Sequence, residues 1–151
     1  MLLDYVWHLR GSVPLGEMSD YTAVFDRVEQ LLAKQQKSAS ERGFDYLVFN
    51  DPLWLNLGGP NWLAMIMYDR GQFLIEQGVS GQRLRYDLRS LHSMVVCLFA
   101  AFIAFFFGFA DDGITGGLRL AAGAFAWLYG GNLILAFARV PVAIRKAASP
   151  A

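Results

Sequence analysis

The side chains that could do chemistry in this sequence are few and widely separated. There are 2 histidines, His8 and His92, and 1 cysteine, Cys97. Catalysis by a nucleophile or a carboxylate needs a base close by, and a metal site needs several ligands close together. No stretch of the sequence groups such residues. The residue types therefore favour a protein that is not an enzyme and that has no metal or cofactor of its own.

His92 and a pair of aspartates have alternative interpretations. His92 begins a long apolar stretch, where it could ligate a haem or chlorophyll-type metal, but Leu88 in place of a small residue hinders the approach of a flat macrocycle. Asp111 and Asp112 could bind a cation, although adjacent carboxylates in a turn are more often solvated. We favour an interfacial histidine and a solvated acidic turn.

Two stretches near the end of the chain are long and apolar enough to cross a membrane. The chain has 151 residues and is 55% hydrophobic, which is high for an ordinary soluble domain. Residues 91–110 carry no formal charge, and residues 118–139 contain only Arg119, Asn132 and the closing Arg139 as strongly polar groups. About 20 helical residues cover the ~30 Å of bilayer hydrocarbon. With the short polar segment 111–117 between them, the stretches predict a transmembrane helical hairpin over residues 91–139.

Small residues at every fourth position predict how these helices meet. In lipid they let backbones approach closely. We expect two stripes to pack against each other, namely Ala100, Ala104 and Gly108 against Ala122, Ala126 and Gly130. Asn132 is expected to hydrogen-bond across helices, to Tyr129 or to a partner's backbone. The outward residues would face lipid or a partner subunit: Phe99, Phe102, Phe106 and Phe109. Alanine and glycine are common in any membrane helix, so the alternative is that the stripes have no packing role.

The distribution of positive charge predicts the topology. Arginine and lysine residues flank the hairpin on its terminal sides, whereas only Arg119 lies near the connecting turn; the flanking residues are Arg83, Arg85, Arg89, Arg139, Arg145 and Lys146. The positive-inside rule then places both termini in the cytoplasm, and in a bacterial cell the hairpin lies in the inner membrane. The formal net charge is +0 with no basic run, which argues against nucleic acid as a partner.

Residues 1–90 predict a small cytoplasmic α+β domain that precedes the two-helix transmembrane hairpin. Apolar residues at spacings of three and four predict a helix from Ser19 or Asp20 to about Lys37. The other expected elements are strands at 5–9 and 44–50, a short helix or buried strand at 62–68 with the helix preferred, a short element at 72–77 and a polar helix at 82–92. Residues 140–151 are expected to form a cytoplasmic tail that is disordered from 147 onward.

Residues 5–75 also carry motifs in an order that resembles a known family. These are Val6-Trp7, Tyr46-Leu47-Val48-Phe49, Asn56-Leu57-Gly58-Gly59 and Asp69-Arg70. They resemble the N-terminal part of the crotonase superfamily, particularly proteins of the diffusible-signal-factor synthase type. The resemblance implies that Gly58 and Gly59 present a backbone N–H to a thioester carbonyl. Pro60 replaces the aspartate usual in the family, and the hairpin stands where the catalytic half would be, so the resemblance implies a fragment without that half.

The function we favour from the sequence is that of a non-catalytic integral membrane subunit that docks within a larger membrane protein complex. Its partners would be membrane lipid and other membrane subunits, in a homo- or hetero-oligomer. The alternative is a homo-oligomeric membrane pore or effector built around Asn132. A further alternative is a membrane-tethered, acyl-thioester-binding crotonase remnant that uses Gly58 and Gly59.

Overall fold

The N-terminal part of the chain forms an antiparallel five-stranded sheet. The computed structural model describes residues 7–16, 20–51, 63–78 and 81–149. The strands follow the spatial order β1-β5-β4-β3-β2, and every neighbouring pair is antiparallel. Their bounds are β1 His8–Pro14, β2 Ala39–Arg42, β3 Tyr46–Asn50, β4 Arg70–Gly78 and β5 Gly81–Arg89.

Strand β5 shows how alternating side chains give the sheet one apolar face and one polar face. Its buried residues are Leu84, Tyr86 and Leu88, whereas Arg83 and Arg85 are exposed on the opposite face. Successive side chains of a strand point to opposite faces, so this is a period of two. The predicted polar helix over 82–92 is therefore wrong for this strand: its charged residues lie on the outer face of a sheet, and a helix begins only after it.

Helix α2 (Tyr21–Lys34) covers the apolar face of the sheet. Asp20 caps its N-terminus by accepting a hydrogen bond from the Thr22 N–H at 3.0 Å, as is typical of this residue type. The helix buries Val24, Phe25, Val28 and Leu32 against the sheet residues Leu47, Phe49, Phe73, Leu84 and Leu88. The helix predicted from Asp20 onward is confirmed, with its end at Lys34.

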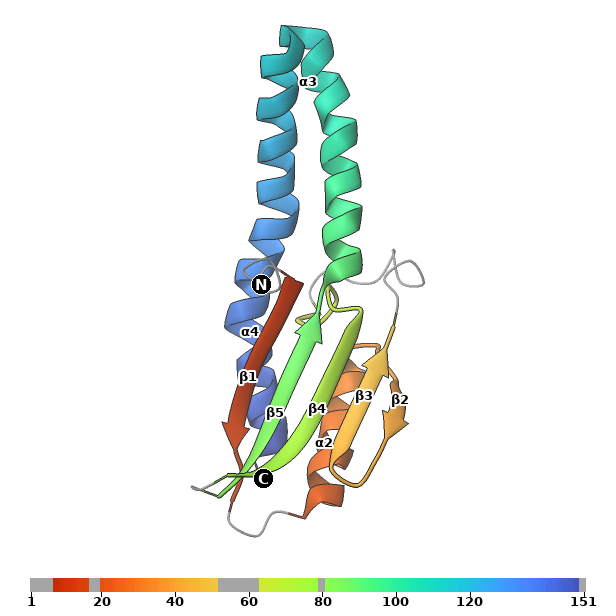
Figure 1. Cartoon of the computed structure of the whole chain (residues 1–151), viewed down its shortest axis with the longest axis vertical. Helices are drawn as coiled ribbons and strands as arrows, with labels where there is room; N and C mark the ends of the chain where they lie inside the picture. Colours follow the sequence, from red (N-terminus) through yellow and green to blue (C-terminus); the bar gives the residue numbers. More distant parts are fainter. Residues whose placement is uncertain (1–6, 17–19, 52–62, 79–80, 150–151) are drawn as a thin grey trace.

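A long apolar helical segment, Leu91–Ala148, follows the sheet (Figure 1). It consists of α3 (Leu91–Phe125), a π-helical turn η2 (Ala126–Gly130) and α4 (Gly131–Ala148). Inside α3, Asp112 and Gly113 leave the helical conformation, and Gly113 takes a φ of 59°, which favours glycine. The ribbon reverses its direction there and returns toward the sheet (Figure 1). The predicted α+β class is thus confirmed, with a long apolar helical segment after the sheet domain.

A hydrogen bond at the base of this segment requires the reversal. The hydroxyl groups of Ser90 and Tyr129 lie 3.0 Å apart. A straight helix between these two positions would separate them by about 60 Å. The contact therefore forms only because the chain folds back at Asp112 and Gly113.

The last part of α4 packs on the sheet beside α2 (Figure 1). Val140 and Ile144 are fully buried and Ala148 is 3% exposed, so one stripe of the helix belongs to the core of the sheet domain. The expectation that residues from 147 onward are disordered is wrong for Ala147 and Ala148. A tail is ordered when it buries apolar side chains, and this stripe lies at helical spacing on α4.

The structure also differs from the prediction for three smaller elements and confirms one strand. The first strand begins at His8 and ends at Pro14, later than the predicted 5–9. Residues 63–68 form a turn and contain no helix, and the short element predicted at 72–77 is part of the nine-residue strand β4. The predicted strand at 44–50 is confirmed as β3 over Tyr46–Asn50.

The burial of α4 gives a stability prediction. Replacing Ile144, which is 0% exposed, by alanine leaves a cavity between α4 and the sheet and should lower the free energy of unfolding by about 2–4 kcal/mol. Val142 lies on the same helix but is 66% exposed, so Val142→Ala should change it by less than about 0.5 kcal/mol. Chemical unfolding followed by circular dichroism in neutral detergent compares the two variants. Equal, small effects would contradict the packing of α4 on the sheet.

Candidate functional site

The sheet domain holds the start of α3 through a buried carboxylate. Asp69 is fully buried and accepts hydrogen bonds from the Arg89 guanidinium at 3.0 and 2.7 Å. Its other oxygen accepts a bond from the His92 backbone N–H at 3.3 Å, in the first turn of α3. Ser90 occupies the N-cap position but makes no side-chain capping bond. Asp69 therefore supplies the negative charge that a helix N-terminus favours.

Ser90 connects the start of α3 to the chain next to β1 and to η2, at the base of the helical segment. Its backbone N–H donates to the Trp7 carbonyl at 2.7 Å, next to the start of β1. Its hydroxyl lies 3.0 Å from the Tyr129 hydroxyl on η2. Because Ser90 is the one residue between β5 and α3, the strand passes into the helix without a flexible linker.

A second contact holds the other end of the helical segment. Arg27 of α2 donates from Nε to the Ala147 carbonyl at 3.0 Å and from Nη2 to the Ala148 carbonyl at 3.4 Å. These carbonyls lie in the last turn of α4, where the helix dipole is negative and backbone acceptors lack intrahelical partners. A cation therefore caps the C-terminus, and a carboxylate caps the N-terminus. Both caps come from the sheet domain.

Further polar groups are buried near Asp69. Lys37 is 6% exposed and lies 3.2 Å from Asp51; burial lowers the pKa of its ammonium, against the opposing effect of the Asp51 carboxylate. The Tyr68 hydroxyl is buried without a hydrogen-bond partner among the described residues, and burial raises its pKa. Within the described ranges, no three histidine, cysteine or acidic residues lie close enough together to hold a metal ion. The contacts described above attach both ends of the helical segment to the sheet domain. We call the residues that make them the joint: Asp69, Arg89, Ser90, Tyr129 and Arg27.

The predicted helix-packing residues lie in different environments. Gly108 is buried, and its backbone lies against that of Gly116, where a side chain on either glycine would clash. Ala100, Ala104 and Gly130 are partly buried. Ala122 and Ala126 are exposed, so the predicted pairing of the two stripes does not form within this chain. Gly117, which the sequence analysis did not select, takes the inner position and meets Phe105.

Asn132 also differs from its prediction. Its side-chain Nδ2 donates to the Leu128 carbonyl at 2.6 Å, one turn earlier in the same helical segment. The residue is exposed, and Tyr129 bonds to Ser90 instead. The expected bond from Asn132 to Tyr129 is therefore wrong, because a carbonyl one turn back is within reach of its amide; a bond from Asn132 to a partner's backbone stays a prediction.

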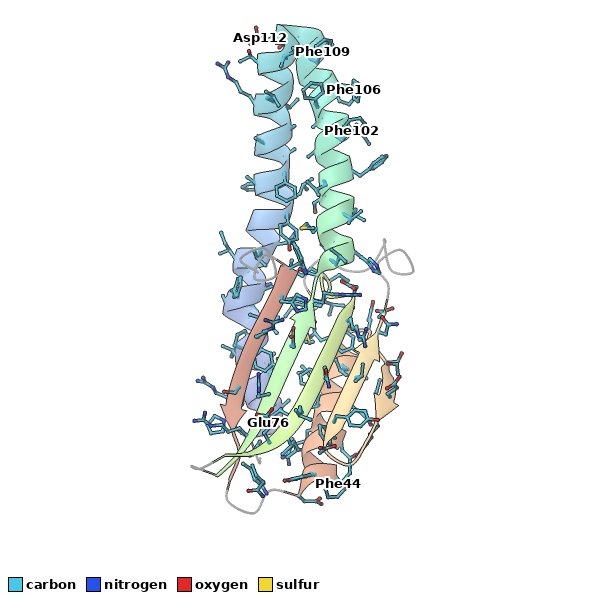
Figure 2. All side chains as sticks on the ribbon, viewed as in Figure 1. Phe44, Glu76, Phe102, Phe106, Phe109 and Asp112 are labelled. Atoms are coloured by element: carbon cyan, nitrogen blue, oxygen red, sulfur yellow. The ribbon has the colours of Figure 1, made fainter. Side chains whose placement is uncertain are left out.

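The outer surface of α3 carries a ridge of exposed aromatic rings, which we call the phenylalanine ridge (Figure 2). Its members are 48–65% exposed and comprise Phe99, Phe102, Phe106 and Phe109. Phe102 and Phe106 pack edge to face with ring centroids 4.9 Å apart. An apolar groove of about 510 Å³ lies along the ridge beside Ile103 and Phe107. By length and composition, the helical segment Leu91–Ala148 is suited to cross a membrane.

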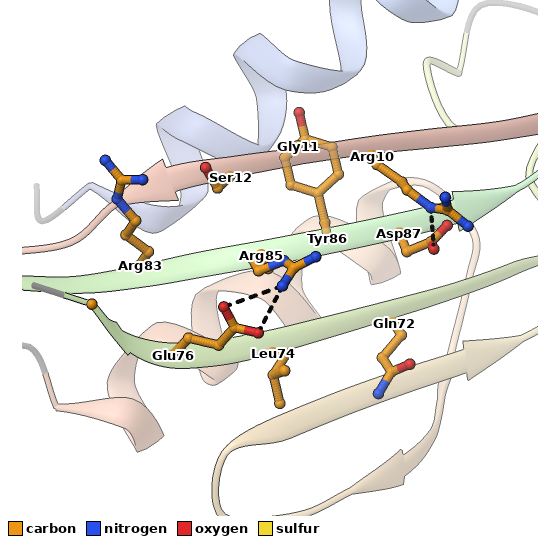
Figure 3. A pocket seen from close by; sticks show the side chains of 11 residues that line it. Arg10, Gly11, Ser12, Gln72, Leu74, Glu76, Arg83, Arg85, Tyr86 and Asp87 are labelled. Atoms are coloured by element: carbon orange, nitrogen blue, oxygen red, sulfur yellow. Dashed lines mark hydrogen bonds and ion pairs between the residues drawn. The ribbon is translucent and has the colours of Figure 1, made fainter. Parts of the chain in front are cut away.

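The outer face of the sheet is polar and carries paired charges (Figure 3). Asp87 accepts a hydrogen bond from Arg10 at 2.7 Å and is also bonded by His8. Partial burial raises the pKa of the Asp87 carboxyl, but these bonds outweigh it and the pKa lies below its ordinary value. Arg85 pairs with Glu76 at 3.0 Å. Asp87 is therefore an ionised acceptor on a face that the sheet domain leaves uncovered.

Other candidates from the sequence are placed as follows. Gly58 and Gly59 lie outside the described residues. Asp111 and Asp112 are exposed at the reversal of α3, with Asp112 3.8 Å from Arg119. Cys97 is a partly buried free thiol.

Comparisons with known proteins give no further assignment. No family model matches the chain, and neither a curated protein nor a solved structure matches it. The candidate function therefore depends on the geometry of the joint, the phenylalanine ridge and the sheet face.

The residues of the joint were missed by the sequence analysis. The sequence indicates Asp69 only as part of a family motif, and Arg27 only as one position of the helix predicted from Ser19 or Asp20 to about Lys37. A weak signal exists for Asp69, since a single acidic residue follows the apolar run 63–68. Arg27 contacts a carbonyl 120 residues further along the chain, and no pattern of neighbouring residues in the sequence indicates such a contact.

The contacts of Asp69 predict a strong effect of replacing it. Asp69→Ala should lower the free energy of unfolding by about 2–3 kcal/mol, because Arg89 and the first turn of α3 lose their acceptor. Asp69→Asn keeps an acceptor oxygen and should cost less. Asp112→Ala is the matched control, since its side chain is 68% exposed and should change stability by less than about 0.5 kcal/mol. Thermal unfolding in neutral detergent ranks the three variants, and an Asp69→Ala variant as stable as the control would contradict the role of the joint.

Proposed function

We propose that this chain is a non-catalytic integral membrane subunit that docks within a larger membrane protein complex. In this proposal residues 1–90 form a cytoplasmic domain, and residues 91–139 contain a transmembrane hairpin with spans predicted at 91–110 and 118–139. The second span leaves the bilayer near Tyr129, because Tyr129 lies level with Ser90 at the base of the first span. The observation that carries it is the exposed apolar surface of α3, because water disfavours a surface of this kind and a bilayer or partner helix covers it.

The dimensions of α3 support the spanning part of the proposal. From Leu91 to the reversal at Asp112 the helix rises by about 30 Å, which is the thickness of bilayer hydrocarbon. Of the most apolar 18-residue window, only 11% is buried within the chain. A helix in the core of a soluble protein is covered by the rest of that protein. Here most apolar side chains of the helix are exposed, so a bilayer or a partner helix is needed to cover them.

The positions of charges support the orientation. Asp112 lies at the reversal, remote from the sheet (Figure 2), with Asp111 next to it in the sequence and Arg119 3.8 Å from its carboxylate. The other basic residues near the spans belong to the sheet domain or to α4, which returns to it: Arg83, Arg85, Arg89, Arg139, Arg145 and Lys146. The positive-inside rule favours the cytoplasm for that side, and in a bacterium the inner membrane for the whole protein.

The phenylalanine ridge is the surface we propose for docking. Rigid aromatic rings along a groove fit a complementary helix by shape, and helix association in lipid depends on such packing. The sheet joint holds the base of α3 in place, so the ridge is presented in one orientation. A partner helix from another subunit is therefore the occupant that this proposal requires.

The orientation is tested with single cysteines in a Cys97→Ser background. A membrane-impermeant maleimide applied to intact spheroplasts should label Thr115→Cys at the reversal, because that side faces the periplasm. It should label Glu41→Cys, on the sheet domain, only after permeabilisation. Labelling of Glu41→Cys in intact spheroplasts would contradict the proposed topology.

The docking surface is tested by purification in mild detergent from the native membrane. Phe102→Ala combined with Phe106→Ala should weaken co-purification of partner subunits by about tenfold or more, because these rings fill the interface. Leu118→Ala combined with Leu120→Ala removes residues that are 60% and 48% exposed on the returning helix and should have no effect. A wild-type chain that purifies as a lone, monodisperse monomer would refute the proposed docking.

Two alternatives have their own measurements. A homo-oligomeric pore or effector is favoured if liposomes that contain only this chain conduct ions. The intrahelical bond of Asn132 uses one of the two amide N–H groups that such an assembly could share between copies. An acyl-thioester-binding crotonase remnant depends on Gly58 and Gly59, and failure to bind acyl-CoA would remove it.

A further inference from the structure

A cleft of about 640 Å³ lies on the outer face of the sheet, away from α2 and α4 (Figure 3). Strands β1, β5 and β4 form its floor. The cleft extends to Glu76, which lies at the end of the sheet remote from the helical reversal (Figure 2). Its size is in the range of small-molecule sites, and its position does not depend on a membrane.

The charges of the cleft leave one cation without an acidic partner. Arg10 is paired with Asp87, and Arg85 is paired with Glu76 at 3.0 and 3.3 Å. Arg83 also lines the cleft, and its side chain makes no hydrogen bond or ion pair with any other described residue. With both carboxylates engaged, the Arg83 end has an excess of positive charge.

Polar side chains beside these arginines are also available for a ligand. Ser12 lies directly opposite Arg85 in the antiparallel register of β1 and β5. The Ser12 hydroxyl and the Gln72 amide line the cleft, and neither bonds to another side chain or backbone group in the described ranges. Gln72 lies opposite Asp87 across β4 and β5. The cleft therefore has donors at one end and both a donor and an ionised acceptor at the other.

We propose that this cleft binds an elongated organic anion. Its phosphate or carboxylate group contacts Arg83, Arg85 and Ser12, since guanidinium groups bind both oxyanions through paired hydrogen bonds. Its other end carries hydroxyl or amino groups that reach Gln72 and Asp87. Asp87 follows Arg83 by four positions along β5, which corresponds to about 13 Å. Leu74, between them on β4, contacts the middle of the ligand.

The oxyanion end is tested by isothermal titration of the full chain in neutral detergent, with pyrophosphate and citrate as probes. We expect saturable 1:1 binding of at least one probe, and the preferred probe distinguishes phosphate from carboxylate. Arg83→Gln should weaken binding by about tenfold, because it removes the unpaired guanidinium. Arg70→Gln is the matched control. Arg70 is exposed, as Arg83 is, but it lies on β4 outside the cleft, so the affinity for the probe should be unchanged.

Three results would overturn the proposal. These are no binding of either probe, an equal loss in Arg70→Gln, and tighter binding of a poly-glutamate peptide with the same dependence on Arg83. The last would identify the face as a docking surface for an acidic protein segment. Circular dichroism confirms that both variants keep their sheet. The membrane topology and the phenylalanine ridge do not enter this test, so its failure leaves the proposed function standing.

Discussion

The arrangement of this protein depends on holding both ends of one long helical segment in the same small sheet domain. A carboxylate, Asp69, meets the N-terminus of α3, and a guanidinium, Arg27, meets the C-terminus of α4. Each charge has the sign that the helix dipole favours at that end. Since both are partly or fully withdrawn from water, they act with less screening than surface charges. The reversal at Asp112 and Gly113 makes this possible, because it returns the chain to where it started.

The sequence predicted those elements whose period and composition are unambiguous. Helix α2 has apolar residues at helical spacing and a capping aspartate, and the apolar segment is evident from its composition alone. Strand β5 was misread because Gln82, Arg83 and Arg85 suggested a polar helix, whereas Leu84, Tyr86 and Leu88 alternate with them. The alternation, and not the polarity, identifies such a strand.

The contacts between helices could be predicted only in part. Gly108 was selected correctly as a close-packed position, because its lack of a side chain is a property of the residue itself. Ala122 and Ala126 were selected by four-residue spacing, but the spacing does not tell which side of the returning helix faces α3. Further on, η2 widens the turn and shifts the faces of the residues after it. The joint was not predictable, since Arg27 and Ala147 meet only in the folded chain.

The packing of α4 on the sheet also determines when the sheet domain can complete its folding during synthesis. Val140, Ile144 and Ala148 belong to the same core as Leu84 and Leu88, although residues 91–139 separate them in the sequence. Domains whose parts are contiguous in sequence can fold as soon as they leave the ribosome. Here the sheet keeps part of its apolar face open until residues 140–148 have been synthesised, so the nascent chain requires protection from aggregation over that interval.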